Sequence, residues 1–422
     1  MSSYSIVIIG GGAGGLELAV ALARDGHSDV LLVDKSPTHV WKPRLHEMAV
    51  GRKAGDVDEI AYAALADKWG FSFQLGELAD VAPDERAVIL APMHDSKGRE
   101  IVPERRIGYR ALVLAIGGAT PDFGVEGARE HATMLDHGRD AKALQSRISR
   151  QMLAHRTVAR DRPLKIVIAG SGATGVELAA HLKDGFQCDA LAPQSTLPDI
   201  EVTILEGADQ ILPGVDSEVR SGVQARLAEA GVVVETGEQI CKVAPGEVQT
   251  TSGNTYVADL TVWATGTAGP AVSKRIEALD TNEKNQWIVR PTLQTTASDA
   301  VFAIGDCCAV QGSPAPTTAQ AASEQAAHLA ENLPRWLNGD APADFEFHNK
   351  GTLLSLGDAG AVGGVKSWFD DDIFINGRMA RAAYQGLYRQ HQFRILGVVK
   401  GTEEVLADMF ERAVGPRLKV HG

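Results

Sequence analysis

Short apolar runs alternate with amphipathic segments through much of the chain. Residues 4–9 and 30–33 are mostly apolar and of strand length, and residues 16–24 between them place apolar side chains at helical spacing. The same order of strand, helix and strand returns over residues 165–169, 176–183 and 201–205. Strands that alternate with helices indicate an α/β fold with parallel sheets, and the repetition predicts two units of this kind.

A glycine-rich turn joins the first strand to the helix in each unit. The first turn contains Gly10, Gly12, Ala13, Gly14 and Gly15, and the second contains Gly170, Gly172, Ala173, Thr174 and Gly175. Glycines there let the backbone turn tightly and approach a pyrophosphate, whose charge faces the free N–H groups of the following helix. A single turn of this type is often only structural. Two of them, each followed by a helix and a strand, predict two bound dinucleotides and electron transfer between them.

The second strand of each unit ends in an acid, Asp34 in the first unit and Glu206 in the second. A carboxylate at this place is positioned to accept hydrogen bonds from a ribose, although a solvated strand end is the alternative for Glu206. No Arg or Lys follows Glu206 closely. The second unit is therefore predicted to prefer NADH over NADPH.

Three later apolar strands end in small residues. They are predicted over residues 111–116, 260–264 and 300–304, and they lead to Gly117, Gly266 and Asp306. Small residues let the backbone pass close to a cofactor, although a strand that ends in an ordinary turn has the same pattern. The carboxylate of Asp306 is placed to meet sugar or ribityl hydroxyls. Because its strand follows the second unit, the first unit is predicted to resume there.

Composition and charge exclude several classes of protein. The 422 residues exceed what one core usually covers and indicate two or three domains. The net charge of −13 argues against nucleic acid as a partner. No stretch approaches the ~18 uncharged apolar residues of a membrane-spanning helix, and no basic segment precedes the first strand. We therefore expect neither secretion nor a membrane span.

The cysteines do not form a metal or disulfide pattern. The four of them, Cys188, Cys241, Cys307 and Cys308, show no C-x-x-C or C-x-x-x-x-C spacing, so no disulfide framework and no metal site are expected. The adjacent Cys307 and Cys308 would form only a strained bridge. Buried thiols are expected there in preference to a redox element.

The order of these motifs resembles the flavoproteins with two dinucleotide-binding domains and, among them, the type II NADH:quinone oxidoreductases. The resemblance covers essentially the whole chain. It is carried by residues 40–47, 172–178, 291–296 and 303–307 and by a C-terminal run at 377–381, Tyr384, 387–389, 391–392 and 416–419. That run is similar to the membrane-associated tail of the bacterial enzymes.

The resemblance implies a division of the chain. Two Rossmann-like domains are expected, the second inserted in the first, together with a C-terminal membrane-associating region. The FAD-binding domain would comprise residues 1–120 and 291–345, the NADH-binding domain with its linkers 121–290, and the quinone and membrane region 346–422.

The resemblance also implies cofactor contacts. FAD would lie on the first glycine turn and on Asp34, Lys42, Leu78, Gly117, Asp306, Ala319 and Gln320. NADH would lie on the second turn and on Glu206 and Gly266.

Four residues are implied in the chemistry. Glu177 matches a carboxylate near the nicotinamide and flavin rings, although it could simply be a first-turn acid favoured by the helix dipole. Gln320 and Glu324 lie in the segment that reads A-Q-x-A-x-Q in the family, and Glu324 replaces the second glutamine. Lys350 would lie by the flavin, where a cation stabilises negative charge, and Leu353 by the quinone together with Gln320. Glu177 and Glu324 are the candidates for a proton route to the quinone.

The implied activity is FAD-dependent transfer of hydride from NADH to the flavin and of two electrons to a membrane quinone. No proton pumping is expected, because no spanning segment is predicted. A sulfide:quinone reductase would need a cysteine in the C-terminal part, and none follows Cys308. A thiol-disulfide reductase would need a cysteine pair after the first turn, which residues 41–47 lack. A non-catalytic FAD and NADH sensor is the alternative from a different class.

The C-terminal tail is suited to a membrane surface. From Arg378 onward it holds eight Lys and Arg and four Asp and Glu, so its formal charge is 8 − 4 = +4 in an acidic chain. One apolar helix face is predicted from Val405, Leu406, Met409, Phe410, Ala413 and Val414. Periodicity alone would also suit packing on the protein itself or on a homodimer partner. With the resemblance, we expect a peripheral protein on the cytoplasmic face of a bacterial inner membrane.

Overall fold

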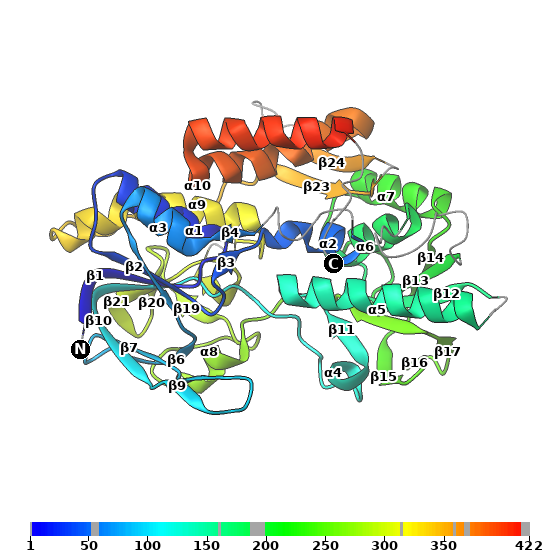
Figure 1. Ribbon diagram of the computed structural model, residues 1–422, viewed down its shortest axis with the longest axis horizontal. Helices are drawn as coiled ribbons and strands as arrows, with labels where there is room; N and C mark the ends of the chain where they lie inside the picture. Colours follow the sequence, from blue (N-terminus) through cyan, green and yellow to red (C-terminus); the bar gives the residue numbers. More distant parts are fainter. Residues whose placement is uncertain are drawn as a thin grey trace.

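The computed structural model describes residues 2–51, 59–158, 162–185, 199–312, 315–357, 360–366 and 372–414. Two sheets with parallel strands at their centres lie side by side, and helices cover them (Figure 1). The α/β fold predicted from the sequence is therefore confirmed.

The first sheet has ten strands and a parallel centre. In that centre β1 (Ser2–Ile9) lies between β2 (Val30–Asp34) and β10 (Arg105–Leu114), with β5 (Ser72–Leu75) beyond β2 and β21 (Ser298–Ala303) beyond β10. The rest are β6 (Leu78–Ala82), β7 (Ala87–Leu90), β19 (Trp287–Val289), β20 (Gln294–Thr295) and β22 (Cys308–Val310). The first sheet thus contains strands that precede those of the second sheet in the sequence and strands that follow them.

The second sheet has five strands, all parallel. Their order is β11 (Ala132–Met134), β18 (Leu260–Trp263), β12 (Leu164–Ala169), β13 (Ile200–Glu206) and β14 (Val233–Thr236). Below it lies a small antiparallel sheet of β15 (Ile240–Ala244), β16 (Glu247–Thr250) and β17 (Thr255–Val257). The helices of this unit are α4 (Ala128–His131), α5 (Gly138–Thr157), α6 (Ala173–Lys183) and α7 (Ser217–Glu229).

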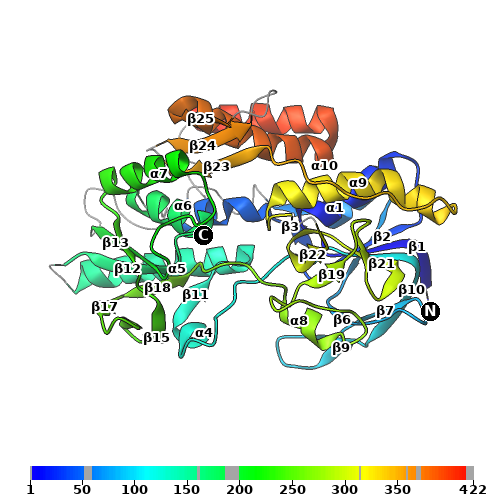
Figure 2. The same cartoon turned by 180° about the vertical axis from the view of Figure 1, so that it is seen from behind.

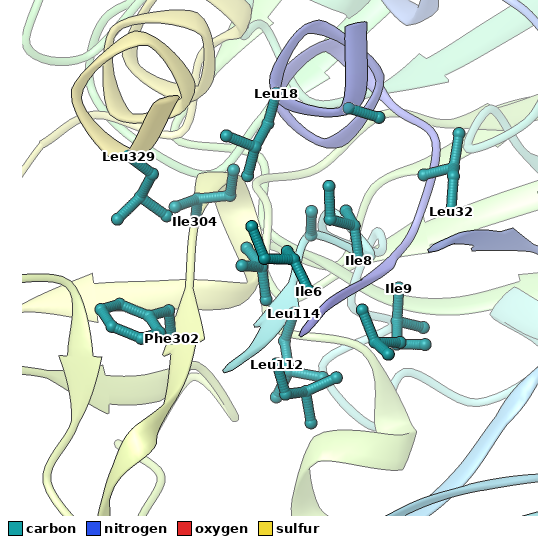
Figure 3. Packing of buried hydrophobic residues seen from close by; sticks show 14 of the residues in the cluster. Ile6, Ile8, Ile9, Leu18, Leu32, Leu112, Leu114, Phe302, Ile304 and Leu329 are labelled. Atoms are coloured by element: carbon teal, nitrogen blue, oxygen red, sulfur yellow. The ribbon is translucent and has the colours of Figure 1, made fainter. Parts of the chain in front are cut away.

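The core of the first unit lies between its sheet and two helices. Leu18 of α1 (Ala13–Arg24) and Leu329 of α9 (Ala319–Leu337) point towards Ile6 and Ile8 of β1 and Leu114 of β10 (Figure 3). These side chains are almost completely buried. The packing fixes both helix starts, and hence both segments expected at the cofactor, against the ends of the strands.

Both helices that follow a glycine turn begin earlier than their apolar spacing predicts. The helices expected from residues 16 and 176 begin at Ala13 and Ala173. The reason is that the turn itself supplies the first helical residues. Glu177 is accordingly not in the first turn of α6, which contains no acidic residue, so the helix-dipole interpretation of this carboxylate is wrong.

A third layer spans both units. It contains β23 (Gly351–Ser355), β24 (Ala361–Lys366) and β25 (Asp372–Asn376), which pair antiparallel, and α10 (Gly377–Val414). The helix α10 contacts α1 of the first unit, while β23 and β24 contact α6 and α7 of the second (Figures 1 and 2). Gly397, with φ of 75°, breaks α10 into two helical segments. In the described part of the chain, no helix is long and apolar enough to cross a membrane.

The remaining elements are short. They are β3 (Thr38–His39), η1 (Lys42–Arg44), α2 (Leu45–Ala49), β4 (Ile60–Ala61), α3 (Tyr62–Trp69), β8 (Met93–His94), β9 (Glu100–Val102), α8 (Ala271–Arg275) and η3 (Gly305–Cys307). Five of them, β3, η1, α2, α3 and η3, supply side chains to the sites described below.

Candidate functional site

The first glycine turn is shaped by two close approaches of the backbone. Gly10 has φ of +103°, and a Cβ there would lie 2.4 Å from the carbonyl oxygen of Ala115. A Cβ on Gly15 would lie 1.9 Å from the carbonyl oxygen of Gly10, so only glycine lets α1 pack on β1 at this distance. Gly12, in contrast, faces open space, because a Cβ there meets no heavy atom within 4 Å.

The open side of this turn suits an anion. Gly12 is the N-cap of α1 and gives the helix no side-chain cap, so no side-chain oxygen of the N-cap competes for the first N–H groups of the helix. These donors and the positive end of the helix dipole face the space above Gly12. A dinucleotide-binding turn uses its three glycines in different ways: one makes the tight turn, one lets a pyrophosphate approach and one lets the helix pack closely. The residues present therefore fit an FAD pyrophosphate.

Asp34 lies beside the first turn at the carboxyl end of β2. One carboxylate oxygen accepts a 2.6 Å hydrogen bond from the Gly11 N–H, and the other accepts one of 2.7 Å from the Ser36 N–H. Burial raises the pKa of Asp34, and these two donors act against the rise. Gly76 donates its N–H to the backbone oxygen of Asp34, which brings the start of β6 at Leu78 to the same edge of the sheet.

Lys42, Gly117 and Asp306 meet on another side of the first unit. Lys42 Nζ donates to the Gly118 oxygen over 3.1 Å, and a Cβ on Gly118 would lie 2.9 Å from Cβ of Asp306. Gly117 has φ of +69°, a backbone conformation that favours glycine. Burial raises the pKa of Asp306, while Lys42 opposes the rise. The half-buried carboxylate is thus held close to a cation.

The second glycine turn repeats the first in detail. Gly170 has φ of +93°, and a Cβ there would lie 2.7 Å from the carbonyl oxygen of Ala264, two residues before Gly266. A Cβ on Gly175 would lie 2.1 Å from the Gly170 oxygen, whereas Gly172 faces open space. The N-cap of α6 is Gly172, again without a side-chain cap. The turn leads through Ala173 and Thr174 into the helix, with the same free donors at its start.

Glu206 occupies the place of Asp34 in the second unit. Its Oε2 accepts hydrogen bonds from the Ser171 N–H at 2.9 Å and the Ser171 hydroxyl at 2.6 Å, and its Oε1 accepts one from the Ala208 N–H at 2.9 Å. It is therefore a fixed part of the turn and not only a solvated strand end. A carboxylate oriented in this way beside the second turn fits the ribose of a dinucleotide.

Comparison with known proteins agrees with these two turns. A model of the pyridine nucleotide-disulphide oxidoreductase family matches residues 4–326. A type II NADH:quinone oxidoreductase of Haemophilus influenzae is 34% identical to this chain and covers 99% of it and 100% of its own length. The chain belongs to the type II NADH:quinone oxidoreductases. A relative of the same name from Staphylococcus aureus is 26% identical and covers 85% of the chain and 89% of its own length. The resemblance inferred from the motifs is confirmed.

Solved structures share the fold. The structure of NDH2 from Plasmodium falciparum in complex with NADH has a TM-score of 0.77 at 15% identity and covers 93% of this chain and 97% of its own. The sulfide:quinone oxidoreductase from the hyperthermophilic bacterium Aquifex aeolicus has a TM-score of 0.72 at 19% identity and covers 100% of this chain and 96% of its own. At these identities the likeness shows the fold alone.

In this member of the type II NADH:quinone oxidoreductases, Glu177 is buried at the junction of three elements. It lies on α6, accepts a 2.9 Å hydrogen bond from the Ser355 N–H of β23, and has its other oxygen 3.4 Å from Nδ1 of His46 on α2. Burial raises its pKa well above the usual value, and the negative charge of Glu47 adds to the rise, while the Ser355 N–H opposes it. Burial also lowers the pKa of His46 to about 4. Both shifts favour the uncharged forms, a protonated carboxyl on Glu177 and a neutral imidazole on His46.

The surroundings of Glu177 were not predicted from the sequence. His46 lies 4.8 Å from His181, ring centre to ring centre, and Nε2 of His181 lies 3.2 Å from the Ser355 hydroxyl. Nothing in the spacing of these histidines along the chain points to their meeting. The only signal is that Glu177 is an acid at a position flanked by apolar residues of α6.

Glu177→Gln is expected to change how stability depends on pH. A carboxyl whose folded pKa is raised destabilises the folded state as pH rises from its ordinary pKa to its folded one, by about 1.4 kcal/mol per pH unit. The amide does not titrate. In thermal unfolding from pH 5 to 8, the stability of the variant relative to the wild type should therefore increase steadily as the pH rises.

Glu324→Gln is the matched control for this experiment. Although burial acts to raise the pKa of Glu324, hydrogen bonds from Lys350, Gln320 and the His348 N–H hold it below its usual value. Its stabilising effect is then complete above pH 5, and the difference between variant and wild type should be constant over the same range. A constant difference for Glu177→Gln as well would show that Glu177 titrates as an ordinary glutamate.

The structure brings Gln320, Glu324 and Lys350 together at the start of α9. Gln320 Nε2 donates to Glu324 Oε1 over 3.1 Å and to the His348 oxygen over 2.8 Å. Lys350 Nζ lies 2.8 Å from the same Glu324 oxygen. Ala319 is the first residue of the helix, and Thr318 caps it. Three of the four predicted chemical residues thus form one polar cluster, with Lys350 its most exposed member.

The strand β23 connects this cluster to Glu177. It begins directly after Lys350 and ends at Ser355, the residue that binds Glu177. A five-residue strand spans about 16 Å, so the two carboxyls lie at opposite ends of one strand and do not share a site. Leu353 is half-buried at its middle.

Cys307 and Cys308 are free, buried thiols, as predicted, and Cys241 is exposed. Burial raises the pKa of Cys307 to about 12 and that of Cys308 well above its usual value. Both are therefore protonated and unreactive at neutral pH. Cys188 lies outside the described residues, as do residues 416–419 of the C-terminal run.

Proposed function

We propose that this protein binds FAD on its first glycine turn and NADH on its second, and transfers two electrons from NADH to a membrane quinone. The observation that carries the proposal is the 34% identity to a type II NADH:quinone oxidoreductase over 100% of that protein's length. This match includes the C-terminal part beyond residue 326, where the broader family model ends. A sensor or a general dinucleotide-binding protein would need only the part before it.

The two turns differ in what covers them, and this supports their assignment. Gly14 of the first turn lies against Ala322 of α9, and α1, which follows the turn, contacts α10 of the third layer. A resident cofactor fits there. The residues in contact with FAD would include the turn, Asp34, Lys42, Asp306 and Gln320. The second turn and Glu206 would hold the dinucleotide that enters and leaves.

FAD, when bound, supplies the chemistry of accepting a hydride and releasing electrons one or two at a time. The protein has to orient it, exclude water and manage charge and protons. Lys350, with its side chain 62% exposed, would stabilise negative charge at the quinone end, where Gln320 and Leu353 would contact the quinone. Glu177, whose pKa burial raises, would hold a proton at a distance from it.

The third layer supports a membrane-associating role for residues 346–422, beside an FAD domain of residues 1–120 and 291–345 and an NADH domain of residues 121–290. Around the break in α10, Val398 and Val399 are 74% and 76% exposed, and Leu406 is 48% exposed. Large apolar side chains at this exposure suit the surface of a bilayer, and the +4 charge of the tail suits anionic lipids. The side chains of the other four residues of the predicted apolar face, from Met409 onward, are not among those that the structure describes.

The test is to purify the protein and record its spectrum, then measure oxidation of NADH and NADPH with ubiquinone and menaquinone analogues. Bound flavin and fast NADH oxidation with a quinone are expected, with slower oxidation of NADPH. Sulfide serves as a control donor and should not be oxidised. Flotation with anionic vesicles, compared between the full chain and one ending before Thr402, tests the membrane surface. A colourless protein would overturn the proposal.

Lys350→Met is expected to lower kcat with quinone roughly tenfold, with little change in the KM for NADH. Removing one donor from a site of developing negative charge lowers kcat by about a hundredfold to a thousandfold when the site excludes water, and by less when the side chain is exposed. Lys242→Met is the matched control, because Lys242 also forms a 2.7 Å ion pair, with Glu126, on the small sheet of β15–β17. Equal kcat values for both variants would remove Lys350 from the quinone site.

A further inference from the structure

A continuous chain of buried polar groups runs from the first glycine turn to the C-terminal helix. It starts at the Gly11 peptide, whose N–H is bound by Asp34. The Gly11 carbonyl oxygen accepts a 2.7 Å hydrogen bond from the Tyr62 hydroxyl and lies 2.9 Å from Nδ1 of His39. Both lone pairs of this oxygen are thus occupied, and the peptide is held from three directions.

This path of polar groups continues through a second histidine, on α10. Nε2 of His39 lies 2.9 Å from Nε2 of His391, and Nδ1 of His391 lies 2.7 Å from Oε1 of Glu17 on α1. The other Glu17 oxygen lies 2.8 Å from Arg394 of α10 and also accepts from the Ser323 hydroxyl of α9. The two histidines are 2% and 3% exposed, and Glu17 is 7% exposed. Three helices therefore meet the FAD turn through this one path.

Counting protons shows how the path must be charged. Both of its ends, the Gly11 carbonyl and the Glu17 carboxylate, can only accept. Three hydrogen bonds between them need three protons, whereas two neutral imidazoles carry two. The histidine pair therefore holds one positive charge.

His39 is the neutral ring of the pair. Burial and the charge of His391 lower its pKa to about 3. The other ring, His391, lies between His39 and the Glu17 carboxylate. Its ring also stacks on Trp41, with ring centres 4.1 Å apart, an arrangement that favours a cation over an aromatic face.

We propose that His39 and His391 are positioning residues for the cofactor: through them α10 holds the Gly11 peptide and retains FAD on the first turn. The inference rests on the assignment of FAD to that turn in the proposed function. Neither histidine needs to touch FAD. A buried charged path of this kind acts as a unit, because removing one member leaves its neighbours unsatisfied.

The test is the rate at which FAD dissociates from purified protein at 25 °C, far below unfolding. We expect His391→Gln and His39→Gln each to increase this rate at least tenfold. The double variant should dissociate no faster than the faster single variant, because either change alone interrupts the path. Additive effects would show two independent losses of packing and would overturn the proposal, as would rates equal to that of the wild type.

Trp69→Phe is the matched control for a loosened α10. Trp69 Nε1 donates a 2.7 Å hydrogen bond to the Ile395 oxygen, so this variant also loses a ring N–H that anchors α10, but it leaves the hydrogen bonds among Gly11, His39 and His391 in place. It should lower the melting temperature and leave the FAD dissociation rate within twofold. A rate increased as much as in the histidine variants would mean that any weakening of α10 releases FAD.

The wild-type protein provides a second measurement that needs no variant. If α10 stabilises bound FAD, bound FAD must stabilise α10 by the same free energy. Hydrogen exchange of the α10 amides around His391 should therefore accelerate when FAD is removed, while the amides of α5 stay protected. Equal exchange in α10 with and without FAD overturns the proposal. A wild-type protein that binds no FAD would instead overturn the proposed function, so the two failures are distinguishable.

Discussion

Gly12→Ala is expected to yield a folded protein that is purified almost without FAD, with binding weakened at least a hundredfold, or about 2.8 kcal/mol. The reason is geometric. A Cβ at Gly12 meets no protein atom within 4 Å, so the apoprotein accepts the methyl group, but the space it enters lies over the free N–H groups at the start of α1. A pyrophosphate bound to those donors needs this space.

The measurements are the ratio of flavin to protein absorbance after purification and a titration of the stripped protein with FAD. Circular dichroism and the melting temperature of the apoprotein should match those of wild-type apoprotein. Gly15→Ala gives the contrast: its Cβ would lie 1.9 Å from the Gly10 oxygen, so it should destabilise the apoprotein itself. If Gly12→Ala retains FAD at the wild-type level, the first turn does not hold the pyrophosphate.

The parts of the fold that are periodic along the chain could be predicted from the sequence. Apolar strands followed by glycine turns place β1, α1 and β2 correctly, and the same holds for β12, α6 and β13. The acids at the ends of β2 and β13 follow from the same pattern, because a parallel strand ends at the edge where ligands bind. Local spacing carries this information, so no knowledge of long-range contacts is needed.

Contacts between distant segments could not be predicted in this way. His39 and His391 meet although they are far apart in the sequence, and each alone reads as an ordinary histidine. Glu177 was implied in the chemistry, with a first-turn acid as the alternative, but its hydrogen bond from the Ser355 N–H of β23 could not be predicted. The break of α10 at Gly397 lies against Trp69, whose ring is 3.1 Å from where a Cβ of Gly397 would lie, and this contact joins segments far apart in the sequence. These features exist only once the third layer is placed.

The third layer also distinguishes the two nearly identical turns from each other. The polar path from Gly11 reaches α10 through His39 and His391, and Gly14 lies against α9. At the second turn, the hydrogen bonds that the described residues make to the Glu206 carboxylate come from its own unit, from Ser171 and Ala208. A turn connected to three helices suits a cofactor that stays, and a turn closed on itself suits a substrate that exchanges.

Gly172→Ala makes the second half of that distinction measurable. This residue occupies in the second turn the place of Gly12 in the first, with open space where a Cβ would be, so the folded apoprotein again tolerates the methyl group. The variant should remain yellow, with FAD bound as in the wild type. Its KM for NADH should rise about a hundredfold, because the methyl group displaces the pyrophosphate of the entering dinucleotide from the start of α6.

The same substitution in two equivalent turns thus has opposite expected effects, and each variant is the control for the other. Reduction of Gly172→Ala by dithionite, followed by reoxidation with quinone, should proceed at the wild-type rate, since that half of the reaction does not use the second turn. Stripped Gly12→Ala protein should still bind NADH in a fluorescence titration. If Gly172→Ala loses FAD and Gly12→Ala keeps it, the two cofactors are assigned to the wrong turns; if both variants lose FAD, the methyl group acts through the fold and not through the ligand.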